Sequence, residues 1–179
     1  MIEATAGEGA ASAAAAAYAI RRGTAADAAL LARHRAEMWS DMGKLPAEVY
    51  PDVVRESAAY FARAVPAGEY HAWLASPAGR PGEVVAGAGL MLRHSIPTIR
   101  RRGGRLESTT RPQGLVVNVF TERAWRRRGL ARLLMTHVIA GARALDVSSL
   151  VLHASDEGRD LYVQLGFVPT NEMRYSGEI

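Results

Sequence analysis

The chain of 179 residues contains no cysteine. This absence excludes disulfide scaffolds, cysteine-ligated zinc or iron–sulfur sites and cysteine nucleophiles. Aromatic residues make up only 7% of the chain, and no apolar run reaches the roughly 18 residues that a membrane-spanning helix needs. Residues 1–17 are small and rich in alanine, and they lack the basic residues of a secretory signal. We therefore expect a cytoplasmic protein with a flexible tail over residues 1–17 and a single domain over residues 18–179.

Positive charge is concentrated in one part of the chain. The formal net charge is only +4, but residues 93–132 hold eleven arginines and two glutamates, a local charge of +9, which leaves −5 for the remainder. Such a distribution is expected when a basic segment binds an anionic ligand. The run Arg100-Arg101-Arg102 also suggests an alternative function, that of a basic nucleic-acid-binding protein. Interleaved aromatic residues and a nucleic-acid-binding motif are both missing, so this is the less favoured alternative.

Hydrophobic periodicity and turn residues predict an alternation of strands and helices. The predicted strands are residues 18–22, 70–76, 84–93, 115–121, 150–153 and 170–175, and the predicted helices are residues 24–42, 47–65, 129–145 and 158–165. This order indicates an α/β (α+β) fold in which helices cover a mixed sheet. Residues 96–114 contain proline, paired glycines and clustered arginines, and they predict a long exposed loop that could include irregular strand.

The most informative segment is residues 115–132, LVVNVFTERAWRRRGLAR. A strand runs into a turn rich in arginine and glycine, and this turn opens a long helix. The first N–H groups of a helix lack partners and its dipole is positive there, so the turn suits an anion. A solvated basic helix start would carry the same residues. No Gly-Lys-Ser/Thr follows and half of Gly-x-Gly-x-x-Gly is missing, so neither a P-loop nor a dinucleotide fingerprint is present, and another phosphate-bearing cofactor is implied.

Residues 126–131, Arg-x-x-Gly-x-Ala, resemble the Q/R-x-x-G-x-G/A signature of the GNAT superfamily of N-acetyltransferases. A second match follows the long helix, where Ser155 lies seven residues before Tyr162 and Leu-Gly-Phe follows at 165–167. Both motifs occur in the order and spacing of the family. The resemblance implies the GNAT fold, a central mixed, mostly antiparallel sheet of six to seven strands with splayed central strands and about four flanking helices.

The resemblance also implies a binding site for acetyl-CoA (coenzyme A). In the family, the strand before the turn bonds the pantetheine arm through its main chain, and the turn holds the pyrophosphate. The matching positions, together with two residues near the last helix, are Val119, Phe120, Thr121, Arg126, Arg127, Arg128, Gly129, Leu130, Ala131, Ser155 and Arg159. Ser155 is equally well explained as a helix N-cap.

The reaction implied is transfer of an acetyl group from acetyl-CoA to a primary amine of a small molecule or peptide by direct attack. The cysteine-free composition agrees, because no thiol is present to carry the acetyl group. Tyr162 is the candidate catalytic residue, since a phenol can protonate the thiolate as it leaves. Its alternative is a core tyrosine on a short amphipathic helix. A second function is a catalytically idle acyl-CoA-binding sensor module.

The general base is left open by the sequence. Relatives that acetylate proteins often carry a glutamate eleven residues before the arginine of the motif, and this chain has Leu115 there. The remaining candidates are water, Glu122, Glu37 and Asp41. Asn118 lies between apolar strand residues and is a candidate for orienting the acceptor, as are the two glutamates.

Three further expectations concern partners and ligands. The five histidines show no pair at a spacing of three or four, so no metal site is expected. Residues 96–114 are interpreted as a lid over the acceptor site. Many relatives dimerise, which makes a homodimer a possible assembly, and no nucleic acid or membrane partner is expected.

Overall fold

The computed structural model describes residues 16–170, 172–173 and 175–176. The strands are β1 (Tyr18–Arg22), β2 (Tyr70–Pro77), β3 (Ala86–Arg93), β4 (Thr98–Arg102), β5 (Arg105–Thr109), β6 (Gln113–Thr121) and β7 (Leu150–Leu152). The helices are α2 (Ala28–Asp41), α3 (Tyr50–Ala64), α4 (Leu130–Ala144) and α5 (Arg159–Gln164), and the 3-10 turns are η1 (Ala25–Asp27) and η2 (Arg123–Trp125). Among these helices none is both long and apolar enough to cross a membrane. The expected flexible tail falls mainly on residues 1–15, which lie outside the described residues.

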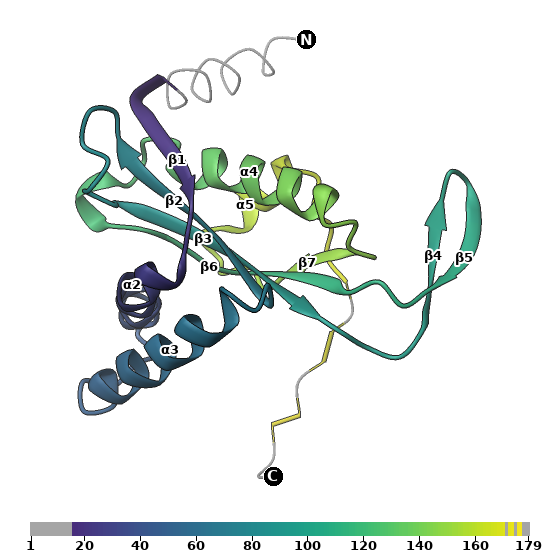
Figure 1. The fold of residues 1–179 in the computed structure, drawn as a ribbon, viewed down its shortest axis with the longest axis horizontal. Helices are drawn as coiled ribbons and strands as arrows, with labels where there is room; N and C mark the ends of the chain where they lie inside the picture. The colour runs from purple at the N-terminus through teal and green to yellow at the C-terminus, as the bar shows by residue number, and fades with distance from the viewer. Residues whose placement is uncertain (1–15, 171, 174, 177–179) are drawn as a thin grey trace.

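The central sheet has five strands in the order β1-β2-β3-β6-β7 (Figure 1). The first three pairs are antiparallel and the last pair, β6 with β7, is parallel. This confirms the mixed, mostly antiparallel α/β sheet, with two differences from the expected six to seven strands. Strands β4 and β5 form a separate sheet. The strand predicted over residues 170–175 is not found in the described part of that segment, where Met173 and Tyr175 are 94% and 73% exposed and have no face to pack against.

Strands β6 and β7 separate partway along their length. β6 pairs with β7 only through residues 114–116, opposite residues 150–152. On its other edge, Asn118 and Val119 of β6 oppose a single residue of β3, which makes a β-bulge. Asn118 adopts a positive φ of 54° at this bulge. Beyond the bulge, the edge of β6 that faces β7 has no partner among the described strands, as the splayed arrangement predicts.

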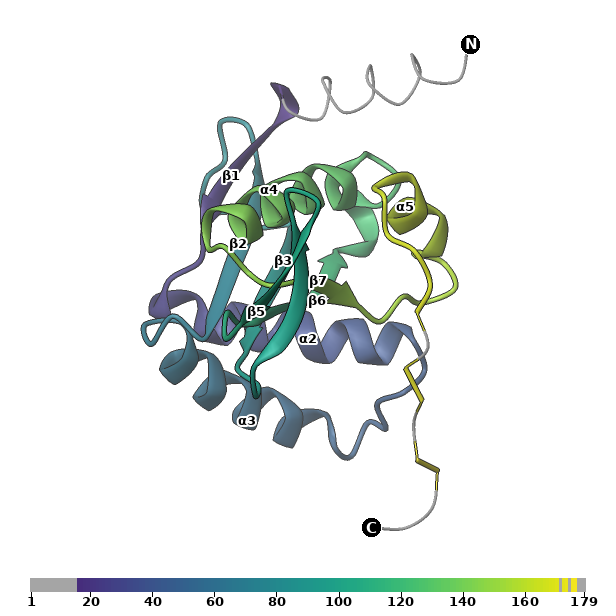
Figure 2. The same cartoon turned by 90° about the vertical axis from the view of Figure 1, so that its right-hand side faces the viewer.

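Helices cover both faces of the sheet (Figure 2). α4 buries Leu134, Met135 and Val138 on one face, where α5 also lies. α2 and α3 pack on the opposite face around Phe61. α3 begins at Tyr50, later than the predicted start at residue 47, because proline 51 is accommodated in its first turn. The helices therefore leave the splayed end of β6 accessible between two layers.

Residues 96–114 are not the irregular loop that their composition predicted. β4 and β5 pair in register around Gly103-Gly104, whose φ values of 53° and 83° suit a two-residue hairpin turn. The hairpin projects from the sheet at the start of β6 (Figure 1). It therefore leaves the body at the end of β6 opposite to the arginine turn.

Candidate functional site

The turn between β6 and α4 presents a row of backbone N–H groups without acceptors. Gly129 is the N-cap residue of α4 with φ 80°, and Arg127 also has a positive φ, 63°. The first backbone bond into the helix runs from Leu133 N to Gly129 O. Within the described structure, no hydrogen bond is donated by the backbone N–H groups of residues 127–132. Because these groups meet the positive end of the helix dipole, the turn is suited to bind a phosphate.

The three arginines of this turn have different environments. Arg126 Nε donates to a main-chain carbonyl at the end of β6 over 3.0 Å, and its Nη2 donates to Asp41. Arg128 donates to a main-chain carbonyl before the turn over 3.0 Å and lies 4.9 Å above the Trp125 ring. Arg127 is exposed and makes no polar side-chain contact in the part of the chain that the structure describes. Arg127 is therefore the arginine of the turn that is free for a ligand.

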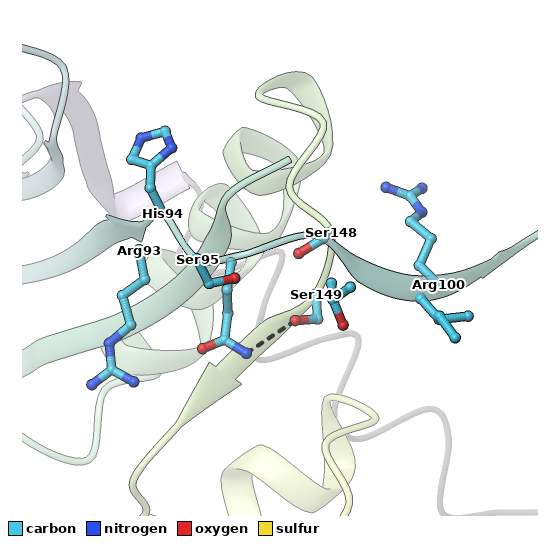
Figure 3. Close-up of a pocket in the computed structure, with 9 residues that line it drawn as sticks. Arg93, His94, Ser95, Arg100, Ser148 and Ser149 are labelled. Atoms are coloured by element: carbon cyan, nitrogen blue, oxygen red, sulfur yellow. Dashed lines mark hydrogen bonds between the residues drawn. The ribbon is translucent and has the colours of Figure 1, made fainter. Parts of the chain in front are cut away.

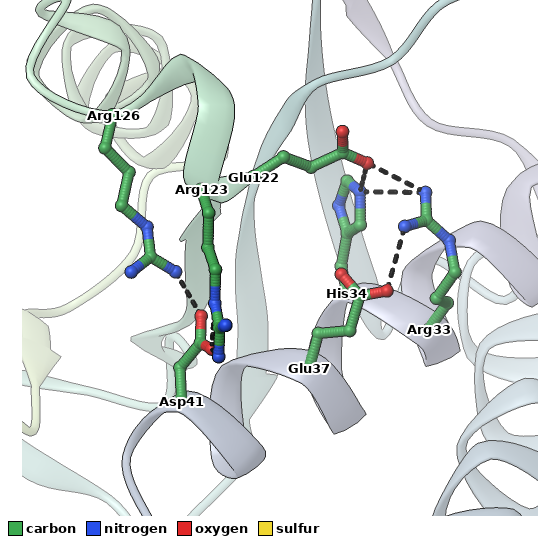
Figure 4. A network of polar contacts seen from close by, with 7 residues as sticks. All are labelled: Arg33, His34, Glu37, Asp41, Glu122, Arg123 and Arg126. Atoms are coloured by element: carbon green, nitrogen blue, oxygen red, sulfur yellow. Dashed lines mark hydrogen bonds and ion pairs between the residues drawn. The ribbon is translucent and has the colours of Figure 1, made fainter.

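Asp41 ties the end of α2 to the arginine turn (Figure 4). Its carboxylate accepts hydrogen bonds from both Arg123 and Arg126. Burial would raise the pKa of Asp41, but the hydrogen bonds from the two guanidinium groups outweigh it and lower that pKa. A carboxylate held in this way is poorly suited to accept a proton, which weighs against Asp41 as the general base.

Both candidate glutamates of the acceptor side belong to one cluster around α2 (Figure 4). Arg33 donates to Glu37 and to Glu122, each over 3.0 Å. His34, only 2% exposed, places Nε2 3.6 Å from Glu122, and its ring centroid is 5.1 Å from that of Phe120. Burial and the charge of Arg33 lower the pKa of His34, so the imidazole is neutral. Sequence reasoning weighed the histidines as metal ligands, and it did not single out His34 as a member of this cluster.

Asn118, at the bulge, is held by two side chains that sequence reasoning did not single out. Its Oδ1 accepts a hydrogen bond from Arg35 Nη1 over 2.8 Å, and its Nδ2 donates to the Tyr70 hydroxyl over 3.0 Å. Tyr70 is 2% exposed, and burial raises its pKa. A Cβ atom at position 89 would fall 1.9 Å from the Tyr70 hydroxyl oxygen, so Gly89 is what lets Tyr70 reach the bulge. No local pattern could reveal these contacts, because they join distant segments.

The residues expected near the last helix lie on the other face of the sheet. Tyr162 packs edge-on to Phe167, with ring centroids 6.0 Å apart, and burial raises its pKa. Its hydroxyl makes no hydrogen bond to any described residue. Ser155 Oγ accepts a hydrogen bond from Gly158 N over 3.3 Å, but the N-cap residue of α5 is Gly158, so Ser155 closes the turn before the helix rather than capping the helix itself; Arg159 is exposed. Tyr162 is thus a neutral phenol with a free hydroxyl.

Tyr162 on α5 lies close to the arginine turn between β6 and α4. Tyr162 and Val119 pack against the same apolar cluster that contains Leu130, the first residue of α4. Glu122 lies farther from the bulge than these residues. It is four positions beyond Asn118, which corresponds to about 13 Å along an extended chain at roughly 3.3 Å per residue. The candidate site is therefore the splayed end of β6, with the arginine turn and Tyr162 on one face and α2 on the other.

A cavity of about 600 Å³ lies elsewhere, at the base of the hairpin (Figure 3). Arg93, Arg100 and Ser149 are among its lining residues, and Gln113 Nε2 donates to Ser149 Oγ over 3.2 Å. None of the predicted site residues lines it. In the described ranges, no group of three or more histidine, cysteine, aspartate or glutamate residues is placed to hold a metal ion.

Comparisons with known proteins identify the family. A sequence profile described as "Acetyltransferase (GNAT) domain" matches residues 104–179. No curated protein sequence matches the chain. Among solved structures, a GCN5-related N-acetyltransferase from Ralstonia eutropha JMP134 is 25% identical with a TM-score of 0.75, over 88% of this chain and 97% of that one.

Two further solved structures share the fold. A predicted acetyltransferase with acetyl-CoA from Clostridium acetobutylicum is 22% identical with a TM-score of 0.72, over 89% of this chain and 96% of that one. A ribosomal-protein-alanine N-acetyltransferase from Brucella melitensis biovar Abortus is 19% identical with a TM-score of 0.61, over 91% of this chain and 99% of that one. With the motifs and the splayed sheet described above, the profile match over residues 104–179 and these structural matches support assignment of the chain to the GNAT superfamily of N-acetyltransferases, as an acyltransferase.

Proposed function

We propose that this acyltransferase moves an acetyl group from acetyl-CoA to a primary amine of a small molecule or peptide by direct attack. The observation that carries the proposal is the row of unpaired backbone N–H groups over residues 127–132. These groups lie at a helix start beside a splayed strand. They fit the phosphates of coenzyme A, since each N–H is a donor that an anionic oxygen can satisfy.

Residues of β6, the turn and α5 would share the binding of coenzyme A. The turn over residues 126–131 would hold the pyrophosphate, and Arg127 is free to meet the 3′-phosphate. Residues 119–121 have main-chain groups on an edge that no strand covers, which suits hydrogen bonding to an extended pantetheine arm. Ser155 and Arg159 stand at the start of α5 and complete this set.

Tyr162 is the general acid of the proposal. When bound, acetyl-CoA supplies an activated thioester carbonyl that an amine can attack and a sulfur that leaves as thiolate. Tyr162 holds its proton at the phenolic oxygen, because burial raises its pKa and disfavours the charged phenolate. Its free hydroxyl can donate that proton without breaking a bond within the described structure.

No side chain of the described site is well placed as a direct base at the bulge. Glu37 and Glu122 both accept from Arg33, and Glu122 lies about 13 Å along the strand from Asn118, at roughly 3.3 Å per residue. We therefore assign the amine proton to water. Asn118 is the candidate nearest to the acceptor. A cytoplasmic location and a homodimer stay predictions of this proposal.

The acceptor class includes peptides as well as small molecules. The Brucella neighbour is named for the alanine of a ribosomal protein. A peptide N-terminus therefore belongs among the acceptors to be tested with this chain.

Ligand-dependent thermal unfolding tests the cofactor. Acetyl-CoA at 100 times its Kd should stabilise the protein by about 2.7 kcal/mol. A matched titration with 3′-dephospho-coenzyme A should give a weaker shift if Arg127 meets the 3′-phosphate. No shift with millimolar acetyl-CoA would contradict the proposal and favour the nucleic-acid-binding alternative.

Thiol release with a panel of primary amines tests the reaction. Release of free coenzyme A that depends on both acetyl-CoA and an amine is the expected result. Stabilisation by acetyl-CoA without amine-dependent thiol release would instead indicate the sensor module.

A further inference from the structure

Arg35 is neither fully exposed to solvent nor paired with a carboxylate of the described residues. It is half-buried on α2, and no carboxylate lies within salt-bridge distance of it among the described residues. Of the other arginines whose side chains the structure describes, those without a carboxylate partner are exposed, except Arg132, which donates to Gln164. A half-buried cation without a counter-ion is costly to the fold. Its retention points to a partner outside the chain.

The surroundings of Arg35 favour an anionic group. Its guanidinium lies 5.1 Å from the centroid of the Trp39 ring, and its charge lowers the pKa of the nearby hydroxyls of Tyr60 and Tyr70 against the larger effect of burial, which raises both. These three rings come from α2, α3 and β2. Tyr70 is buried and Trp39 is 38% exposed, so these rings shield the guanidinium from water in part, and this strengthens an ionic contact made there.

One edge of the Arg35 guanidinium is available for such a contact. Only Nη1 donates within the described structure, to Asn118 Oδ1 over 2.8 Å. This bond fixes the plane of the guanidinium and leaves other N–H groups free. A planar carboxylate matches such a fork with two parallel hydrogen bonds.

The position of Arg35 relates this contact to the reaction. Asn118 sits at the bulge where β6 begins to separate from β7. The Arg35 guanidinium is hydrogen-bonded to the side chain of Asn118, whose backbone forms part of the bulge. Tyr162 on α5 lies on the opposite face of the sheet from α2 (Figure 2), so an acceptor held by Arg35 would approach the bulge from the α2 side.

We propose that Arg35 binds the carboxylate of the acceptor, and that the acceptor class is α-amino acids. The inference rests on the proposed acetyl transfer to an amine. Binding of the carboxylate at Arg35 would place the adjacent amine at the bulge. A phosphate group would carry more negative charge than this single guanidinium can balance, so a carboxylate is the better match.

The test compares matched acceptors rather than single rates. Each of a set of α-amino acids, such as phenylalanine, is paired with its decarboxylated amine, such as phenethylamine, and kcat/KM is measured with acetyl-CoA. The wild-type protein should favour the carboxylate-bearing member by at least about tenfold. Arg35→Gln should reduce this ratio toward one, mainly through a higher KM for the amino acid. Arg35→Lys keeps the charge but loses the fork, and should give an intermediate ratio.

Arg55→Gln is the matched control, because Arg55 lies on α3 with a side chain that is 67% exposed. It should leave the ratio as in the wild-type protein. Equal or faster acetylation of the decarboxylated amines, an unchanged ratio in Arg35→Gln, or preference for a phosphate-bearing amine such as phosphoethanolamine would overturn the assignment of Arg35. Acetylation of peptide amines alone would overturn it too. Failure of every amine to release thiol would instead contradict the proposed acetyl transfer.

Discussion

Replacement of Tyr162 by phenylalanine separates chemistry from structure in this protein. The change removes one oxygen atom, and that oxygen has no hydrogen-bond partner among the described residues. The ring and its contact with Phe167 at 6.0 Å are kept. We therefore expect the free energy of unfolding to change by less than about 0.5 kcal/mol. General acid catalysis contributes about 10²–10⁴ to a rate, so turnover should fall at least tenfold.

The assay measures turnover, acetyl-CoA affinity and stability on the same variant. Kd for acetyl-CoA should stay within about twofold, because the lost group acts in the chemical step rather than in binding. Tyr50→Phe, at the start of α3, is the matched control and should leave turnover unchanged. Wild-type turnover in Tyr162→Phe would refute the general-acid role, and a loss of turnover matched by a loss of stability would indicate a structural role instead.

The pH dependence gives a second test of the same residue. Burial raises the pKa of Tyr162 above its ordinary value of 10.0, so the phenol stays protonated throughout the neutral and mildly alkaline range. Activity should rise with pH as the acceptor amine loses its proton, and loss of the acid should appear only above pH 10. A descending limb centred below that value, absent from Tyr162→Phe, would contradict the raised pKa.

Three further predictions concern the fold and the turn. Gly89→Ala places a Cβ atom 1.9 Å from the Tyr70 hydroxyl oxygen, so chemical denaturation should show a loss of about 2–4 kcal/mol, whereas Gly82→Ala, which meets nothing within 4 Å, should show almost none. Asp41→Asn frees two guanidinium groups at the phosphate turn, so calorimetry should give a Kd for acetyl-CoA that is about three- to tenfold lower, and weaker binding would contradict this reasoning. The hydrogen bond from an arginine of β1 lowers the pKa of Asp27 to about 2 from 3.8. The stabilisation by the Asp27 carboxylate is therefore complete above pH 3.8 and is lost as the pH falls toward 2. Asp27→Asn should destabilise the protein by about 1 kcal/mol at neutral pH, and chemical denaturation should show no such difference near pH 2. A difference that persists at pH 2 would contradict this explanation.

The phosphate turn could be predicted from the sequence because its determinants are local. A buried strand, a glycine that tolerates φ 80° and an amphipathic helix follow one another within residues 115–145. The unpaired N–H groups of residues 129–132 are a direct consequence of that order, since a helix start leaves its first donors free. The splaying of β6 from β7, in contrast, was expected from the resemblance to the GNAT family and not from a local sequence pattern.

The partners of the site residues could not be predicted, because they lie far away in the chain. Asn118 meets Tyr70 and Arg35, which are 48 and 83 residues distant. Arg126 meets Asp41 at a separation of 85 residues. Such contacts depend on how the layers pack, and a single sequence records only that each residue is polar.

The β4–β5 hairpin has a sequence pattern for its turn, but a loop was predicted from the sequence over this segment. Gly103-Gly104 between two short runs is the pattern of a two-residue turn. The flanking strands carry few apolar residues, and Ile99 and Leu106 are 71% and 66% exposed. Without a buried face there is no alternation of apolar and polar residues, so composition suggested a loop.

An arginine that is paired with a carboxylate of the same chain gives little information about ligands, and the basic segment of residues 93–132 contains such arginines. Arg100 and Arg111 of the hairpin region lie 3.6 Å and 3.0 Å from the carboxylate of Asp146, so part of the positive charge counted along the sequence is neutralised by the fold. Arg35 lies outside the basic segment, yet it is the half-buried arginine for which no acidic partner occurs among the described residues. The density of arginine along the chain marks the turn that we propose as the phosphate site, whereas an uncompensated charge in the folded protein marks the place where we propose that the acceptor is bound.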